Sequence, residues 1–284
     1  MRFDRRKIIP SLGDWGRCWQ VPLAAACYAL LLLGCEPQPP LDNAAKSKPS
    51  KAERTAAAQP RFPGPTTMVV YQPVFRWKNG QSSAQGTGFF AKAPNGKIVA
   101  VSSAHYLQRN GPPLLEAAWC NVVTGEPVAS ASTSWGSVGS AGKMSPEINL
   151  RSDYLLLPVE DALKPEEVLE FDLRSMPKVG ERVWLPDKKA STEIGHDNVA
   201  GTVTEATEKY IAVELDVAIK LQSQSGSPFL SQTTGRVIGT LSMANTSTNP
   251  PVIYLTPAEA ILRQLAKPDL FPKLRDEVGI SMDE

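Results

Sequence analysis

A succession of short apolar runs, separated by turn residues, most limits the folds that this chain can adopt. About eleven runs of three to six residues are rich in side chains that favour strands, and Gly, Pro and Asn fall between them. Helical periodicity appears mainly in 257–267. The pattern predicts an all-β protein with two antiparallel barrels of the six-stranded type and a C-terminal helix. The runs cover residues 68–71, 86–91, 97–102, 114–119, 154–159, 182–185, 199–204, 210–215, 228–230, 237–241 and 252–255.

Size, charge and cysteine content set broad limits. A chain of 284 residues has material for one domain of about 200 residues or for two small ones. Its formal net charge of +1 gives no reason to expect a nucleic acid as partner. Of the four cysteines only Cys120 falls in the predicted folded part, as a buried strand residue, so no intrachain disulfide is expected there. His105 and His196 are the only histidines, which leaves no zinc-ligand cluster, and His196 lies in a polar loop.

The first 34 residues have the composition of an export signal. Five basic residues precede Val21–Gly34, an apolar stretch of 14 residues that is short for a membrane span and suits a secretory signal. Residues 32–35 (Leu-Leu-Gly-Cys) resemble a bacterial lipobox. We therefore expect a lipid on Cys35 that anchors the protein in the cell envelope, to a bacterial membrane, facing the periplasm or the exterior. An uncleaved anchor and an ordinary signal peptide are the alternatives, and the Arg pair at 5–6 hints at a twin-arginine signal.

Four segments follow from these changes in composition. Residues 1–34 are predicted to be the signal peptide, and 35–66, rich in Pro, Ala and Lys, a disordered tether. Residues 67–267 hold the predicted strands and the helix. Residues 268–284 form a C-terminal tail.

Three side chains spread along the folded part can be combined into one site. Ser225 is flanked by small residues and followed by Gly226, so its hydroxyl can stand clear of the backbone. Such a hydroxyl becomes a nucleophile when a histidine, itself held by a carboxylate, removes its proton. His105 and Asp153 lie upstream, in Ser-Ser-Ala-His and Ser-Asp-Tyr-Leu-Leu-Leu contexts. Taken singly, each of the three is more simply a structural residue.

Together the three contexts resemble the signatures of the trypsin-like (chymotrypsin-fold) serine peptidases, nearest to the bacterial Deg type. The order His105, Asp153, Ser225 is the order of that family, and spacings of 48 and 72 residues suit it. The resemblance extends over roughly residues 67–267. Supporting phrases lie at 86–90 (Gly-Thr-Gly-Phe-Phe), 178–183 (Lys-Val-Gly-Glu-Arg-Val) and 254–259 (Tyr-Leu-Thr-Pro-Ala-Glu).

The resemblance implies a serine endopeptidase that acts on a peptide or protein substrate without a cofactor or metal. Ser225 would be the nucleophile, His105 the general base, and Asp153 the carboxylate that orients the imidazole. The backbone N–H groups of Ser223 and Ser225 would form the oxyanion hole. Ser242 would support the carboxylate, although it could instead be a strand serine that faces solvent.

Two departures from the family pattern bear on activity. Ser223 and Ser227 stand where glycines are usual, and Gln224 stands where an acidic residue or Asn is usual. A residue with a Cβ at 223 disfavours the backbone conformation that a glycine takes easily, which would turn one oxyanion donor away. The alternative function is therefore a catalytically weak or dead binding module of the same fold. A β-rich surface lipoprotein with no enzymatic history is a second alternative.

The residues ahead of the nucleophile indicate the preferred substrate. The resemblance places the floor of the specificity pocket at 217–219 (Val-Ala-Ile) and its wall after Ser242. The nearest acidic residue is Asp216. An apolar lining cannot balance a buried cationic side chain. We expect cleavage after small or medium apolar residues.

Overall fold

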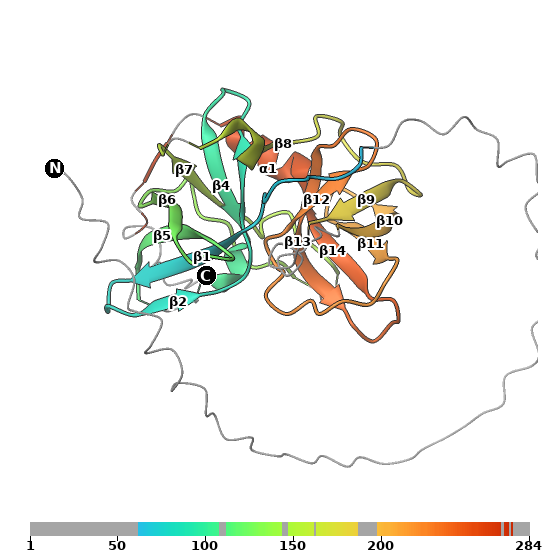
Figure 1. Cartoon of the computed structure of the whole chain (residues 1–284), viewed down its shortest axis with the longest axis horizontal. Coiled ribbons are helices and arrows are strands. Elements are labelled where there is room, and N and C mark those ends of the chain that lie inside the picture. The colour runs from blue at the N-terminus through green and yellow to red at the C-terminus, as the bar shows by residue number, and fades with distance from the viewer. Residues whose placement is uncertain are drawn as a thin grey trace, which may run out of the picture. The chain divides into compact units, whose positions relative to one another are not determined.

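The computed structural model describes residues 62–107, 112–143, 147–161, 163–186, 198–267, 270–272 and 274. The described strands are β1 (Tyr71–Trp77), β2 (Ser82–Ala84), β3 (Phe89–Lys92), β4 (Ile98–Ser102), β5 (Leu114–Asn121), β6 (Pro127–Ala131), β7 (Leu155–Val159), β8 (Val168–Glu170), β9 (Arg182–Leu185), β10 (Val199–Ala206), β11 (Ile211–Leu215), β12 (Pro228–Ser231), β13 (Val237–Asn245) and β14 (Val252–Pro257). One α-helix, α1 (Ala258–Leu265), and the 3-10 turns η4 (Ala104–Tyr106) and η5 (Pro165–Glu167) complete these elements. The strands gather in two groups, with α1 between them (Figure 1).

The C-terminal group is a closed barrel. Its strand order is β10-β11-β14-β13-β12-β9, and each pair is antiparallel. Closure leaves no unpaired strand edge. Alternate residues of these strands point inward, so Val183, Val213 and Phe229 are fully buried in one apolar cluster.

The N-terminal group consists of two four-stranded sheets, β2-β1-β5-β6 and β7-β4-β3-β8. Tyr71 and Gly88 join them by exchanging two backbone hydrogen bonds of 2.8 and 2.9 Å. After β6, the Trp135 N–H donates to the Leu156 oxygen of β7 (2.8 Å). A Cβ on Gly88 would lie 2.5 Å from Nε1 of Trp119, so only glycine fits where the sheets meet.

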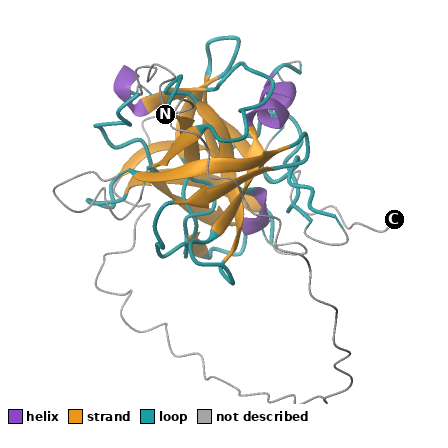
Figure 2. Ribbon diagram, turned by 90° about the vertical axis from the view of Figure 1, so that its right-hand side faces the viewer, coloured by secondary structure: helices purple, strands orange, loops and turns teal. Residues whose placement is uncertain are grey.

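An apolar cluster between the two groups fixes their relative position. Phe89 and Val101 from the first group pack with Leu230 and Val237 from the second. The helix α1 adds Ile261 to the same cluster. The helical segments lie at the rim of this β-structure (Figure 2). Because buried packing is dense, the cluster allows little sliding of one half on the other.

The predicted fold class is confirmed: the described part is all-β, with two strand groups that are antiparallel except for the pair β3–β8, and a C-terminal helix. The closed hydrogen-bond ladder is restricted to the second group. Sequence reasoning missed β2, β6 and β8, and it placed the first strand at 68–71 although β1 begins at Tyr71. The missed strands are partly exposed and lack a long apolar run.

Several predictions concern residues outside the described ranges. These are the signal peptide, Cys35, His196 and most of the C-terminal tail. At the end of the predicted tether, the Phe62 N–H donates to the Gln232 oxygen (2.6 Å) and its own oxygen accepts from the Trp184 indole (2.8 Å). Phe62 therefore contacts the C-terminal barrel.

Within the described ranges, no helix has the length and apolar character needed to cross a membrane.

Candidate active site

His105 is fixed by the turn that ends the first half's central strand. β4 ends at Ser102, and η4 follows it. His105 is the middle residue of η4; it comes after Ala104, which is buried, and before Tyr106. A single 3-10 turn presents its side chain at one defined angle. The His105 side chain is 24% exposed, which leaves part of the ring open to a reactant.

Asp153 forms two hydrogen bonds with His105. Its Oδ2 lies 2.8 Å from His105 Nδ1, and its Oδ1 accepts the His105 backbone N–H at 2.9 Å. The Asp153 side chain is fully buried. A carboxylate only accepts hydrogen bonds, so in the neutral imidazole the proton sits on Nδ1 and Nε2 keeps a free lone pair. The ring is thereby prepared to act as a base through Nε2.

The nucleophile turn is held by the other half of the molecule. The Thr87 N–H donates to the Ser225 oxygen (2.8 Å). The Leu241 oxygen accepts both the Gly226 N–H (2.7 Å) and the Ser103 hydroxyl (3.0 Å). Ser103 lies two residues before His105, so one carbonyl oxygen bonds the nucleophile turn and the histidine segment together. Gly226 has φ +91°, and a Cβ there would lie 1.9 Å from the Thr87 oxygen.

Ser223 takes a left-handed backbone conformation. Its φ is +64°, and it is the one non-glycine residue of the described ranges with positive φ. Such a conformation costs a residue with a Cβ about 1–2 kcal/mol. The buried Thr87 hydroxyl donates to the Ser223 oxygen at 2.8 Å, which holds the next peptide in place. Within the described ranges, the N–H groups of Ser223 and Ser225 donate to no protein acceptor.

Ser242 contacts the site differently from the expected support of the carboxylate. Its backbone oxygen accepts the Ser225 hydroxyl at 3.4 Å. Its own hydroxyl lies 2.7 Å from Thr256 Oγ1, which in turn lies within hydrogen-bonding distance of the Leu150 and Asp153 backbone oxygens. Ser242 therefore reaches the Asp153 loop through Thr256.

Tyr106 is a contact that sequence reasoning missed. Its ring packs on the His105 imidazole with 4.5 Å between centroids. Burial raises the pKa of the Tyr106 phenol, and hydrogen bonding with the Ser225 side chain opposes that rise. Tyr106 thus packs on the imidazole of the proposed catalytic base. The only signal in the sequence is an aromatic residue directly after the histidine.

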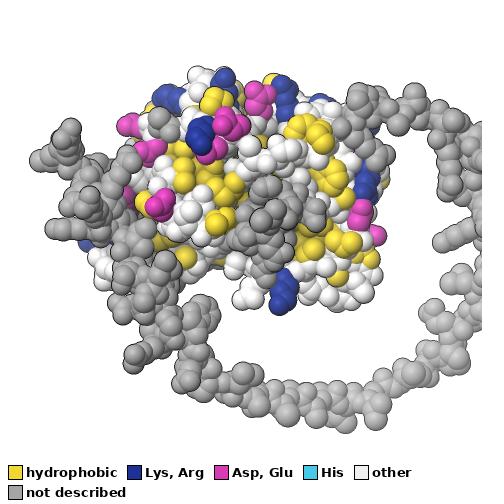
Figure 3. Space-filling model, in the orientation of Figure 1, with side chains coloured by type: hydrophobic (Ala, Val, Ile, Leu, Met, Phe, Trp, Pro, Cys, Tyr) yellow, Lys and Arg dark blue, Asp and Glu magenta, His cyan; other side chains and the backbone are white. Residues whose placement is uncertain are grey.

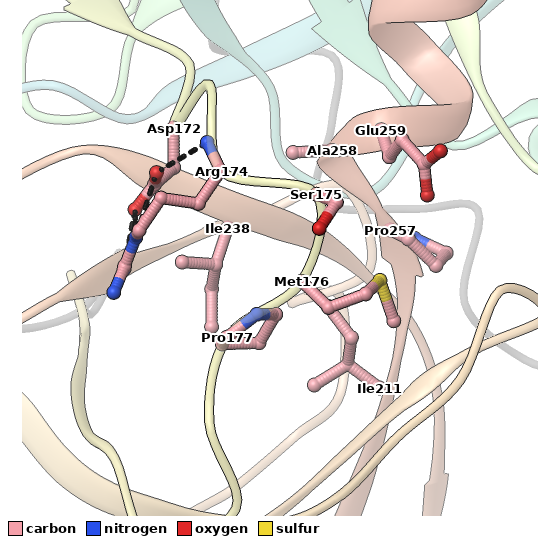
Figure 4. Close-up of a pocket in the computed structure, with 10 residues that line it drawn as sticks. All are labelled: Asp172, Arg174, Ser175, Met176, Pro177, Ile211, Ile238, Pro257, Ala258 and Glu259. Carbon is pink, nitrogen blue, oxygen red and sulfur yellow. Dashed lines mark hydrogen bonds and ion pairs between the residues drawn. The ribbon is translucent and has the colours of Figure 1, made fainter.

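Two cavities among the described residues lie away from this site. One has a volume of about 10 Å³, room for a single water (Figure 4). An open pocket of about 400 Å³ lies beside the segment that precedes Asp153. Neither is lined by His105, Asp153 or Ser225. The smaller is lined by Asp172, Arg174, Ser175, Met176, Pro177, Ile211, Ile238, Pro257, Ala258 and Glu259, and the larger by Glu147, Ile148, Arg151, Glu205, Thr207, Glu208, Lys209 and Tyr210.

Acidic and basic side chains are mixed on the face seen in Figure 3, in line with the formal net charge of +1. Among the described residues no group of three or more His, Cys, Asp or Glu side chains is placed to hold a metal ion.

No family model matches this chain, and no curated protein is similar to it in sequence. Several solved structures are similar in fold. A thermostable serine protease, AL20, from an extremophilic microorganism is 14% identical, with 69% of this chain and 94% of that chain covered and a TM-score of 0.46. The active form of the Rv3671c protease from M. tuberculosis is 16% identical (89% and 96% covered, TM-score 0.44), and a mutant of human heparin binding protein is 13% identical (71% and 91%, TM-score 0.47). At these identities the similarity is one of fold alone.

Proposed function

We propose that this protein is a serine endopeptidase that hydrolyses peptide bonds through Ser225, His105 and Asp153. The observation that carries the proposal is the two-point hydrogen bonding of the buried Asp153 to His105. The Leu241 oxygen, which accepts from both Gly226 and Ser103, links the Ser225 turn to the His105 segment. A buried carboxylate that fixes a partly exposed imidazole is the arrangement that activates a hydroxyl.

The reaction follows from the positions of the protons. The Ser225 hydroxyl turns from the Ser242 oxygen to His105 Nε2, gives up its proton there, and its oxygen attacks the substrate carbonyl carbon. Asp153 stabilises the imidazolium that forms. Nε2 then passes the proton to the leaving amine, and an acyl-enzyme remains on Ser225. Water repeats the sequence, with its proton taken by Nε2, and releases the acid.

The oxyanion is proposed to bind the N–H groups of Ser223 and Ser225. The positive φ of Ser223 and the hold of Thr87 on its oxygen support this assignment, because they keep a glycine-like conformation at a residue that has a side chain. Each such donor contributes about 10²–10³-fold to the rate. This arrangement favours an active enzyme over a dead binding module.

The specificity proposed is for small or medium apolar side chains. Asp216, the nearest acid to the proposed pocket floor, is hydrogen-bonded to Arg182 (2.7 Å), which lowers the pKa of its carboxyl group. Its charge is therefore already balanced within the protein. A peptide-library profile dominated by Arg or Lys would contradict this specificity.

Export and anchoring belong to the same proposal. The basic and apolar leader and the lipobox-like residues 32–35 support a lipid on Cys35 and a place in the cell envelope, on the periplasmic or outer face of a bacterial membrane. A Cys35→Ala variant should take up no labelled fatty acid and should separate from the membrane fraction without detergent. Equal fractionation of the two proteins, with no fatty acid on either, would contradict the anchor.

The decisive experiment is labelling of the full-length protein in detergent with a fluorophosphonate probe. The wild type and a Ser247→Ala control, altered at an exposed loop serine, should be labelled equally. Ser225→Ala should abolish labelling and peptide cleavage. Labelling that survives in Ser225→Ala would reject the assigned nucleophile.

A further inference from the structure

The relative orientation of the two proposed oxyanion donors is set by two residues. Because peptide groups are planar, the N–H of Ser223 and the N–H of Ser225 are related only through the φ and ψ angles of Ser223 and Gln224. Ser223 has φ +64°, and the Thr87 hydroxyl donates to its oxygen. Gln224 needs a restraint of its own if the two donors are to point at one oxygen atom.

Ser227 donates two hydrogen bonds to Gln224. Its N–H donates to the Gln224 backbone oxygen at 2.9 Å, and its hydroxyl donates to the Gln224 side-chain oxygen Oε1 at 3.1 Å. The Gln224 backbone oxygen belongs to the same planar peptide as the Ser225 N–H, so the first bond fixes the plane of that donor. The second bond ties the Gln224 side chain across the same turn. Both residues are buried, so water does not compete for these bonds.

The two partners are both departures from the family pattern. Ser227 stands where a glycine is usual, and a glycine has no hydroxyl to donate. Gln224 stands where an acidic residue or Asn is usual, and its side chain supplies the acceptor that the Ser227 hydroxyl meets. Two substitutions that look unrelated in the sequence are therefore donor and acceptor of one buried hydrogen bond, next to the proposed nucleophile.

We propose that Ser227 and Gln224 are positioning residues, whose side-chain hydrogen bond holds the peptide between Gln224 and Ser225 so that its N–H points at the oxyanion. The inference rests on the proposed function and adds two residues to the same site. The pair acts through the backbone of the turn. Because the negative oxygen exists only after attack, loss of the pair should slow the chemical step and leave substrate binding unchanged.

The test compares Ser227→Ala with the wild type, full-length and in detergent, on a peptide that the wild type cleaves. We expect kcat to fall about three- to tenfold at unchanged KM, the factor for loss of one neutral hydrogen bond. Ser134→Ala is the matched control: Ser134 is also buried, and its hydroxyl donates to the Gly136 oxygen (2.8 Å) in the N-terminal half. That control should keep the wild-type kcat. Equal kcat values for Ser227→Ala and Ser134→Ala would overturn the inference and leave the proposed function standing.

A double-mutant cycle tests whether the two side chains act together. Gln224→Met removes the acceptor, and we expect the double variant Ser227→Ala/Gln224→Met to have a kcat no lower than that of the slower single variant. Losses that multiply, or a double variant that regains the wild-type kcat, would overturn the inference. Ser227→Cys keeps a weak donor and should lose less activity than Ser227→Ala. A wild type that neither cleaves peptides nor takes up the fluorophosphonate probe would reject the proposed function and the inference together.

Discussion

The two halves of the proposed site are held by different means. In the N-terminal half, one side chain provides both contacts: the carboxylate of the buried Asp153 is hydrogen-bonded to the ring and to the backbone N–H of His105. In the C-terminal half, the Ser225 turn depends on backbone geometry, with a left-handed Ser223 and contacts from Thr87 across the interface. The base is thus prepared locally, whereas the nucleophile and the oxyanion donors are prepared by the docking of the halves.

The largest effect should follow a change to the locally prepared half. Asp153→Asn keeps the size of the side chain but places an amide N–H opposite His105 Nδ1, which favours the wrong tautomer. We expect kcat for peptide hydrolysis to fall by about 10³–10⁴-fold. Circular dichroism should show an unchanged fold. Retention of more than about a tenth of the activity would mean that Asp153 does not orient the base.

The next effect tests the half that is prepared by docking. Thr87→Val removes the hydroxyl that holds the Ser223 oxygen and leaves that oxygen without this donor. We expect kcat to fall by about 10–100-fold, part of the full value of one oxyanion donor, while KM changes little. Thr87→Ser, which keeps a hydroxyl, is the matched control and should retain most of the activity. Equal kinetics of Thr87→Val and the wild type would show that the turn is also locally prepared.

A third prediction concerns the segment that connects the halves. Arg174 bonds Asp172 of that segment and Glu181 ahead of β9, and both carboxylates are nearly buried. Arg174→Met leaves two carboxylates without their cation and should lower the free energy of unfolding by about 1–3 kcal/mol. Denaturant unfolding at pH 7 measures this, with Arg263→Met, changed in an exposed pair on α1, as the control.

The same pairs make stability depend on pH. Burial alone would raise the pKa of Asp172 and Glu181, but hydrogen bonds, chiefly from Arg174, outweigh it and lower both pKa values in the folded state. The unfolded chain therefore binds more protons in acid. The stabilisation is present above the ordinary pKa values of 3.8 and 4.5 and is lost as pH falls through the lower folded values. The pH dependence of Tm below about pH 5 should be shallower in Arg174→Met.

The smallest effect should come from Ser223→Gly. Glycine adopts φ +64° without the steric cost of a Cβ, so the free energy of unfolding should rise by up to about 1 kcal/mol. Activity should be equal to that of the wild type or higher, because the oxyanion donors keep their places. If only Ser223→Gly were labelled by the fluorophosphonate probe, the wild-type oxyanion hole would be collapsed and the binding-module alternative would hold.

Much of the fold could be predicted because its signals are local. Runs such as 182–185, which coincides with β9, carry strand propensity and follow a turn at 179–180. The positions of His105, Asp153 and Ser225 could be predicted from short contexts in a fixed order. Strand β8 could not, because its three residues pair in parallel with β3, far away in the sequence, and their burial pattern is weak.

The contacts that complete the site depend on long-range docking. In the sequence Thr87 is only one residue of the Gly-Thr-Gly-Phe-Phe segment at 86–90. In the structure its hydroxyl donates a hydrogen bond to the oxygen of Ser223, 136 positions later. The pairing of Ser242 with Thr256 depends on the register between β13 and β14, in which Leu241 opposes Leu255. Tyr106 gave no periodic or compositional signal. Residue type alone does not encode such contacts.

The hold of the first half on the Ser225 turn has a consequence for timing. Thr87 and Ser103 are synthesised before the turn that they support, and their hydrogen bonds to Ser223, Ser225 and Leu241 can form only once that later part of the chain is present. The turn that carries Ser225 is therefore completed late in synthesis. An unfinished chain carries the proposed base without the contacts that position the proposed nucleophile.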